Sequence, residues 1–329
     1  MKKIALLCVV FILCNSLSGC AQASKKTSAT SEKDRYVFLV AGFDEAAENT
    51  DVLFTVSYDS NKSEARVAQI PRDTYFAFGK VQNKINQLYA SKVSGGVSQE
   101  KALRETTEEI ASAFGASYDG FFGVKISTFK KIVDAIGGLD INLTEDKTIH
   151  LEGEDPIVLK RGSNHIDGES AERFVRYRSG YAMGDLGRID AQKIFLNALF
   201  AKALSGLKLP TIIKVASIVE KEVITDVKLY DFINVFIDII NSKGDKKAFY
   251  ATVPGEPVES KNGLSFYVLN RKSAAEMTAR YMFADKAFDE KLKFLDSENE
   301  SFSDVYYDDS IKLKEYTTDN ISNLRIAKK

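Results

Sequence analysis

The chain has 329 residues, of which 44% are hydrophobic, so it can bury the core of one large domain or two ordinary ones. Its formal charge of −1 argues against a general nucleic-acid binder, because that role needs a broadly basic face. Any anion site in this chain must therefore be local.

An export signal is predicted at residues 1–19. Lys2 and Lys3 precede an apolar run at residues 4–13, which is shorter than the roughly 20 residues that a membrane-spanning helix needs. The run Leu17-Ser18-Gly19-Cys20 then resembles the lipobox of bacterial lipoproteins, whose cysteine is lipidated and becomes the first residue of the mature chain. We therefore expect a lipid anchor at Cys20 on the extracellular face of the cell membrane.

The other cysteines agree with this interpretation. Cys8 and Cys14 would leave with the signal, so the mature chain would keep Cys20 alone and form no internal disulfide. A plain secretory signal followed by an unmodified cysteine is the alternative. Residues 20–34 are small and polar and are expected to be a flexible tether.

Strands and helices are predicted to alternate from residue 35 onward. Apolar runs predict strands over residues 36–41, 52–58 and 65–70, the first two buried on both faces. The later elements are helices over 84–94, 98–114, 128–136, 194–204, 226–240 and 273–283, and strands over 118–124, 139–143, 248–253 and 264–269. This alternation predicts an α/β fold, a layered α/β/α domain with a central mixed sheet over residues 35–285.

Residues 286–329 differ from this domain. They are dense in Asp, Glu, Lys and Ser, with scattered aromatic residues and no sustained hydrophobic period. We expect a loosely ordered polar extension and assign it no function.

Arginine is concentrated in one stretch. The sequence has twelve arginines and thirty-three lysines, yet residues 173–188 hold four arginines and residues 162–192 hold no lysine. A guanidinium binds carboxylate or phosphate through two hydrogen bonds, so this bias suggests an oxyanion site. A solvated surface with Glu169, Glu172 and Asp185 as acid partners is the alternative.

The spacing of these residues restricts the backbone. Arg176 and Arg178 would point to different faces of a helix, so the chain must leave helical geometry near residues 175–177 if both reach one ligand. Arg188 and Gln192 are four residues apart and would share a helix face.

Two carboxylates and two cations are expected near the ends of the first strands. Asp44 follows the first strand and Asp51 opens the second, in the crevice where open α/β sheets place ligands. Two carboxylates with ligand phosphates and water are the usual way to hold Mg²⁺. Pro71 directs Arg72 toward the same crevice, and Lys84 opens the next helical stretch. Turn residues and surface charges are the alternatives for each of these residues taken alone.

Together these residues resemble the LytR-CpsA-Psr family. The resemblance covers residues 36–205 closely and the segment to residue 283 loosely. In chain order, the matching motifs are Gly42-Phe43-Asp44, Thr50-Asp51, Ile70-Pro71-Arg72-Asp73, Lys84-Ile85-Asn86 with Tyr89 and Gly95-Gly96, Val133-Asp134-Ala135-Ile136-Gly137-Gly138-Leu139, and Val175-Arg176-Tyr177-Arg178 with Gly184-Asp185 and Arg188 to Gln192.

The resemblance implies a membrane-attached enzyme outside a Gram-positive cell. Members of the family move a glycopolymer, such as wall teichoic acid or capsule, from an undecaprenyl diphosphate carrier to peptidoglycan, and an apolar groove between sheet and helices takes the prenyl chain. By this resemblance Asp44 and Asp51 hold Mg²⁺, or Mn²⁺, at the pyrophosphate. The implied pyrophosphate-binding residues are Arg72, Lys84, Arg176, Arg178, Arg188 and Gln192.

The chemistry of the residues agrees with this role. A diphosphate leaving group gathers negative charge, which guanidinium groups and one divalent ion can stabilise without a covalent protein intermediate. The resemblance implies that a muramic acid hydroxyl attacks the sugar phosphate in line, with Asp51 and Arg72 as catalytic residues. Asp51 or Asp73 would take the acceptor's proton, and the sequence does not choose between them.

Three positions depart from the family's pattern. Ala46, Asn49 and Ala191 stand where arginine is common, and the loop between Asp44 and Asp51 is short. These departures indicate a lower phosphate affinity or a different substrate. They support the alternative of a non-catalytic, lipid-anchored module that binds wall polymer or prenyl diphosphate, and a pyrophosphatase is a third interpretation.

Other chemistries find little support in the sequence. His150 stands in a predicted loop or edge strand and His165 in a predicted turn, and both are expected at the surface. The sequence shows no Cys and His cluster for zinc, no Gly-rich nucleotide loop and no nucleophile elbow.

Overall fold

The computed structural model describes residues 34–44, 46, 49–78, 81–205, 207–228, 245–287, 290–292, 300–321 and 324. The export signal, Cys20, the tether up to residue 33 and the helix expected beyond residue 228 lie outside these residues. Within the described part of the chain, none of the helices has the length and apolar character that a bilayer crossing requires.

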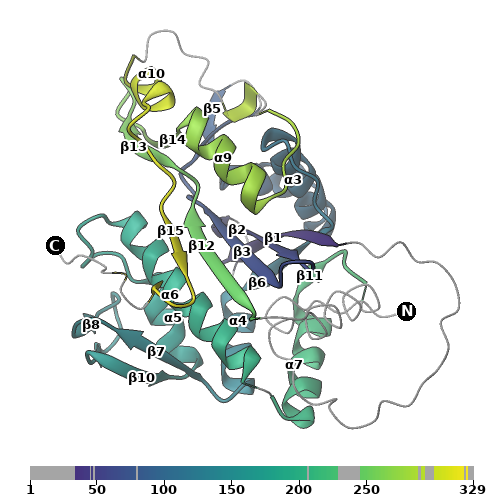
Figure 1. Ribbon diagram of the computed structural model, residues 1–329, viewed down its shortest axis with the longest axis vertical. Coiled ribbons are helices and arrows are strands. Elements are labelled where there is room, and N and C mark those ends of the chain that lie inside the picture. Colours follow the sequence, from purple (N-terminus) through teal and green to yellow (C-terminus); the bar gives the residue numbers. More distant parts are fainter. Residues whose placement is uncertain are drawn as a thin grey trace, which may run out of the picture.

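A mixed seven-stranded sheet forms the centre of the described chain (Figure 1). Its order is β11-β6-β1-β2-β3-β12-β15, in which β1 pairs with β6 and β3 with β12 in parallel and the other neighbours are antiparallel. The mixed central sheet predicted from the sequence is therefore confirmed. The strands are β11 (Ile224–Thr225), β6 (Gly120–Lys125), β1 (Arg35–Phe43), β2 (Thr50–Asp59), β3 (Glu64–Ile70), β12 (Lys247–Thr252) and β15 (Glu315–Thr317).

Helices cover both faces of this sheet, because successive side chains of a strand point to opposite faces. In β1, Phe38 and Val40 pack in a core with α4 to α7, whereas Leu39 and Ala41 pack in a second core with α2, α3 and α9. Figure 1 shows α4 to α7 on one side of the sheet and α3 and α9 on the other, which confirms the α/β/α layers. The helices are α2 (Gln87–Ser94), α3 (Gln99–Ala113), α4 (Ile126–Ala135), α5 (Gly168–Arg176), α6 (Asp185–Leu204), α7 (Leu209–Glu222), α9 (Arg271–Tyr281) and α10 (Glu300–Tyr307), with a 3-10 turn η1 (Glu290–Leu292).

Several elements were not expected from the sequence. Helix α7 was not among the predicted helices; Pro210 stands in its first turn, where proline is well tolerated. The described residues also form two-stranded ladders outside the sheet, and in two of these one strand matches a strand predicted over residues 139–143 or 264–269. These are β4 (Tyr75–Phe78) with β5 (Val81–Lys84), β7 (Leu139–Leu143) with β10 (Gly162–Ile166), β8 (Lys147–Ile149) with β9 (Ile157–Leu159), and β13 (Gly255–Glu259) with β14 (Ser265–Leu269).

The expectation of a loosely ordered extension over residues 286–329 is wrong for its described part. β15 pairs with β12 at the edge of the sheet, and α10 contacts both β13 and β14. The side chain of Phe302 is fully buried between Tyr75 and Phe266, with ring centroids 6.0 and 5.8 Å away. Of the other aromatic residues, Tyr306 shares the cluster of Phe302, Tyr316 packs against the core on the α4 to α7 side, and Tyr307 is exposed.

We predict that Phe302→Ala lowers the free energy of unfolding by about 3–5 kcal/mol, because it leaves a cavity beside two aromatic rings. Urea unfolding measures this. Tyr307→Ala, in the same helix but exposed, should cost no more than about 0.5 kcal/mol. Equal small effects of the two substitutions would show that α10 is not part of the folded domain.

Candidate active site

One cavity of about 630 Å³ lies between the sheet and helices α4, α5 and α6. The carboxyl ends of β1, β3 and β6 meet at this edge, since these strands run in the same direction. Such an edge is where open α/β sheets place ligands. The cavity has an apolar and a charged part, each supplied by several elements.

The apolar part is a wall of aliphatic and aromatic side chains. Phe129 of α4 and Phe195 of α6 pack with ring centroids 5.1 Å apart. The apolar lining residues are Val40, Ala41, Phe43, Val52, Phe54, Val124, Ile126, Phe129, Val175, Phe195, Leu196 and Leu199. Such a surface favours a hydrocarbon ligand, because binding removes apolar area of both the ligand and the wall from water.

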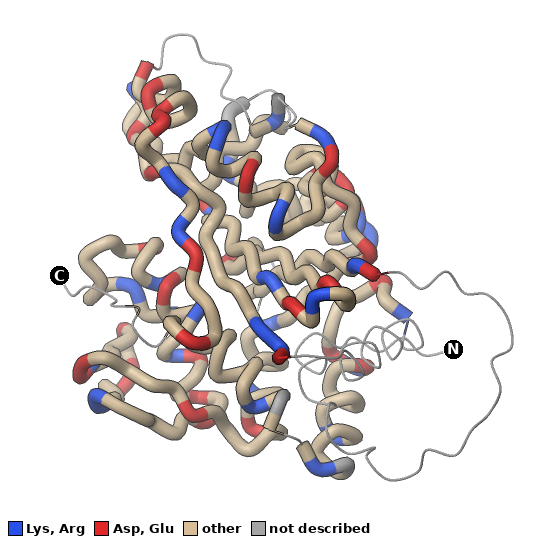
Figure 2. The backbone as a smooth tube through the Cα atoms, viewed as in Figure 1, with Lys and Arg blue, Asp and Glu red and all other residues tan. Residues whose placement is uncertain are grey.

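The charged part gathers four arginines, Arg72, Arg176, Arg178 and Arg188, in the same cavity. Helix α5 ends at Arg176, and Tyr177 takes an extended conformation with φ −60° and ψ 133°. The predicted departure from helical geometry is thus confirmed, and it lets Arg176 and Arg178 both line the cavity. Figure 2 shows basic and acidic residues interspersed over the described chain, so this cluster is a local feature.

Arg188 is the most deeply buried of these arginines and lies one turn into α6. Its guanidinium contacts Asp185 at 2.8 Å and donates a 3.3 Å hydrogen bond to the backbone carbonyl of Asp51. Burial lowers the pKa of Arg188, and the nearby carboxylate of Asp185 opposes this shift. The predicted shared face with Gln192 is confirmed, because both residues line the cavity.

Arg72 links the acidic and basic groups. Its guanidinium donates a 2.7 Å hydrogen bond to Asp51 and lies 3.7 Å from Asp185. Asp51 and Asp185 therefore hold Arg72 and Arg188 close together despite their like charges.

Asp44 and Asp51 both line the cavity, Asp44 directly after β1 and Asp51 within β2. Among the described residues no group of three or more His, Cys, Asp and Glu is placed to hold a metal ion. Two carboxylates fit a Mg²⁺ site that phosphate oxygens and water complete, because Mg²⁺ commonly keeps such ligands. The residues present thus suit an ion that binds together with a phosphorylated ligand.

Gln192 has a contact that the sequence did not suggest. Its side-chain amide donates a 3.1 Å hydrogen bond to the carbonyl of Val175 and accepts one of 3.0 Å from Gln69 of β3. Gln69 also lines the cavity. One amide hydrogen of Gln192 is therefore occupied in fixing the end of α5, directly before Arg176.

Lys84 is not brought into this cluster. It ends β5, and its ammonium pairs with Asp73 at 2.9 Å. Neither Lys84 nor Asp73 is among the residues that line the cavity. The structure therefore gives no support to Lys84 as a pyrophosphate-binding residue, since the β4–β5 ladder holds it beside another carboxylate.

Lys130 and Glu172 line the cavity as well, although the sequence did not point to a role for either in the site. Glu172 had appeared only as a possible surface partner for arginine. Glu172 is instead a buried carboxylate, and the spacing of the buried residues in α5 could have indicated this burial.

The three departures from the expected arginine pattern differ in their surroundings. Ala46 and Asn49 are exposed in the loop after β1 and are not among the cavity lining. Ala191 is fully buried in the core on the helix-α6 side of the sheet. An arginine at position 191 would have to displace this packing.

The two histidines, His150 and His165, are exposed as predicted.

Comparisons with known proteins add to this geometry. The model of the LytR_cpsA_psr family matches residues 15–282. The polyisoprenyl-teichoic acid–peptidoglycan teichoic acid transferase TagU of Oceanobacillus iheyensis is 26% identical over 243 residues, which cover 73% of this chain and 72% of that protein.

Solved structures share the fold. The crystal structure of B. subtilis TagV matches with a TM-score of 0.63 and 21% identity, covering 78% of this chain and 100% of that chain. TagT bound to LIIa-WTA matches with a TM-score of 0.61 and 22% identity, covering 79% of this chain and 95% of that one.

Proposed function

Because the chain belongs to the LytR-CpsA-Psr family, we propose that it is a phosphotransferase that moves a glycopolymer from an undecaprenyl diphosphate carrier to peptidoglycan outside a Gram-positive cell. One observation carries this proposal: four arginines and two aspartates share a cavity with a long apolar wall. A polyprenyl diphosphate has the matching combination of a hydrocarbon chain and a charged headgroup. The name of the relative TagU describes a reaction of this class.

The proposed reaction is an in-line displacement. The acceptor hydroxyl attacks the phosphorus that carries the sugar, and the bond from that phosphorus to the bridging oxygen breaks, so prenyl phosphate leaves. Arg72, Arg176, Arg178 and Arg188 bind the diphosphate oxygens and stabilise the charge that grows on the leaving group. Of the two candidate bases, Asp51 lines the cavity and Asp73 pairs with Lys84, so Asp51 is the better placed to accept the acceptor's proton.

A divalent ion is part of the proposal. Asp44 and Asp51 would hold Mg²⁺ or Mn²⁺, which would neutralise charge on the diphosphate. The arginines would then orient the headgroup at the end of the apolar wall.

The lipid anchor is likewise a proposal, and it rests on the lipobox at residues 17–20. A diacylated Cys20 followed by a short polar tether would keep the cavity close to the membrane that contains the carrier.

We predict that Arg72→Ala and Arg176→Ala each lower transfer by at least about a hundredfold, because each removes a positioned donor to the leaving group. The assay follows release of prenyl phosphate from a prenyl-diphosphate-linked glycan in the presence of Mg²⁺ and peptidoglycan. Arg161→Ala, at an exposed arginine outside the cavity lining, is the control and should transfer normally. Normal transfer by both cavity variants would reject this site.

The same assay separates the alternatives. Substrate that binds but stays intact would indicate a non-catalytic module, which Ala46 and Asn49 make worth testing. Release of prenyl phosphate without attachment to peptidoglycan would indicate a pyrophosphatase.

We predict that a chelator abolishes transfer and that added Mg²⁺ restores it. Asp44→Asn should raise the Mg²⁺ concentration needed for half-maximal transfer by about tenfold or more, because it removes one of two charged ligands. Calorimetric titration of Mg²⁺ into the protein with a bound prenyl diphosphate provides a measurement independent of turnover. Transfer that is insensitive to chelation would contradict a metal at Asp44 and Asp51.

We predict that Cys20→Ala prevents lipid labelling of the protein and moves it from the membrane fraction to the medium. Cys14→Ala, within the expected signal, is the matched control and should leave the protein in the membrane fraction. Membrane retention and lipid labelling of the Cys20 variant would show that the anchor lies elsewhere.

A further inference from the structure

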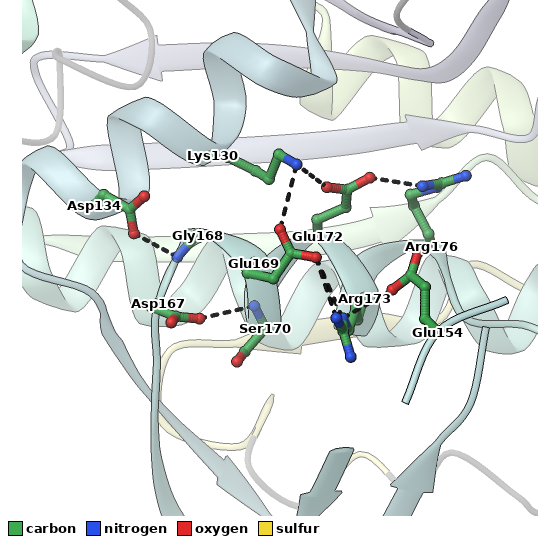
Figure 3. Close-up of polar contacts among 10 residues, drawn as sticks. All are labelled: Lys130, Asp134, Glu154, Asp167, Gly168, Glu169, Ser170, Glu172, Arg173 and Arg176. Carbon is green, nitrogen blue, oxygen red and sulfur yellow. Dashed lines mark hydrogen bonds and ion pairs between the residues drawn. The ribbon is translucent and has the colours of Figure 1, made fainter. Parts of the chain in front are cut away.

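Glu172 is a nearly buried carboxylate at the wall of the cavity. Its side chain lies on α5, one turn before Arg176, and is 9% exposed. One oxygen accepts a 2.6 Å hydrogen bond from Arg176, and the other lies 2.8 Å from the ammonium of Lys130 on α4. Figure 3 shows these residues as a continuous chain of contacts from Lys130 through Glu172 to Arg176.

The three residues stand where the two parts of the cavity meet. All three line it, and their neighbours Phe129 and Val175 belong to the apolar wall. The helices that carry them are fixed to each other, because Asp134 of α4 accepts a 2.7 Å hydrogen bond from the backbone of Gly168 at the start of α5 (Figure 3). Glu172 therefore lies on a helix linked to α4, beside the exposed side chain of Arg176.

Arg176 needs such support. Its side chain is 53% exposed, and a long exposed side chain loses rotational freedom when it binds a ligand. The bond to Glu172 uses one guanidinium nitrogen and leaves other N–H donors for a phosphate. Part of the entropy cost of binding is then met before the substrate arrives.

Lys130 completes the arrangement. A buried carboxylate is stable only when paired, and Lys130 remains as its partner if Arg176 shifts toward a ligand. The hydrogen bond to Glu172 raises the pKa of Lys130, which keeps this ammonium charged. The three charges together leave one net positive charge facing the cavity.

We propose that Glu172 is a positioning residue for the transfer reaction, which holds the Arg176 guanidinium beside the diphosphate while Lys130 balances its charge. The inference rests on the proposed function, since it assigns a role at the same site. It concerns a residue that itself need not touch the substrate.

A second effect of Glu172 acts in the opposite direction. Its negative charge repels a diphosphate, so removing it could strengthen binding. A diphosphate would bind at the exposed end of Arg176, which is 53% exposed, and charge effects there amount to less than about tenfold in affinity. Loss of a charged hydrogen bond that orients a ligand-binding group costs about ten- to a hundredfold. Positioning should therefore outweigh repulsion.

The test compares Glu172→Gln with Glu169→Gln. Glu169 is on the same helix and also pairs with Lys130, at 3.3 Å, but it is exposed and does not line the cavity. Glu172→Gln should lower kcat/KM for release of prenyl phosphate about ten- to a hundredfold, and Glu169→Gln should leave it unchanged. Unchanged or higher kcat/KM for a folded Glu172→Gln variant would overturn the inference.

A double-mutant cycle with Arg176→Ala distinguishes positioning from a general effect on the fold. If Glu172 acts through Arg176, Glu172→Gln should have little further effect on kcat/KM in the Arg176→Ala background. Effects that add fully would contradict the inference. Should Glu172→Gln fail to fold, Glu172→Asp replaces it, because the shorter carboxylate keeps its charge but cannot hold both cations. A folded Glu172→Asp variant with normal transfer would also overturn the inference.

Failure of the inference can be told from failure of the proposed function. If the wild-type protein releases no prenyl phosphate, the proposed transfer is wrong. The role of Glu172 can then still be tested by calorimetric measurement of the affinity for farnesyl diphosphate. Glu172→Gln should weaken this affinity and Glu169→Gln should not. Equal affinities of the two variants would overturn the inference in either case.

Discussion

The site depends on carboxylates that offset the repulsion between its arginines. Four guanidinium groups that line one cavity repel each other unless carboxylates lie between them. Asp51 and Asp185 hold Arg72 and Arg188, and Glu172 holds Arg176. These acids come from a strand, from the first turn of α6 and from the last turns of α5. The sheet and two helices must therefore pack correctly before the cations can occupy one site.

The same packing separates the charged part of the cavity from the apolar part. Apolar side chains of β1, β2, α4 and α6 form the wall, whereas the acids Asp44, Asp51 and Glu172 lie after β1, at the start of β2 and in α5. A ligand with a hydrocarbon chain can lie along the wall only if its headgroup reaches the arginines. The cavity thus selects for a combination of chemistries, and neither part alone would distinguish a prenyl diphosphate from a lipid or from a free phosphate.

Much of this arrangement could be predicted from the sequence, because it has local signals. The spacing of Arg176 and Arg178 predicted the end of α5, and the strand ends predicted where Asp44 and Asp51 lie. Lys84, which was grouped with the phosphate-binding residues, lies outside the cavity lining because the pairing of β4 with β5 places it beside Asp73. So short a ladder has no clear period in the sequence. Gln69 and Lys130 were missed for a related reason. Each is one polar residue in an ordinary strand or helix, and only the tertiary fold shows that it faces a cavity. The aromatic residues near the C-terminus gave no period either, since Phe302 and Tyr306 pack in one cluster and Tyr316 in another.

The absence of arginine at positions 46, 49 and 191 does not by itself imply a weak phosphate site. Ala191 is buried in the core, so a side chain there contributes packing rather than charge to the cavity. Positions 46 and 49 lie in an exposed loop, where a cation would be screened by water and salt. Binding of a phosphate in the cavity depends on the charged side chains that line it. These are five basic side chains, including Lys130, and three acidic ones. This excess of positive charge lies within one cavity, whereas cations on the loop would stand outside its lining. In the proposed site, Lys130 and Glu172 would therefore matter more than the loop substitutions, because Glu172 pairs with both Arg176 and Lys130 at the cavity wall.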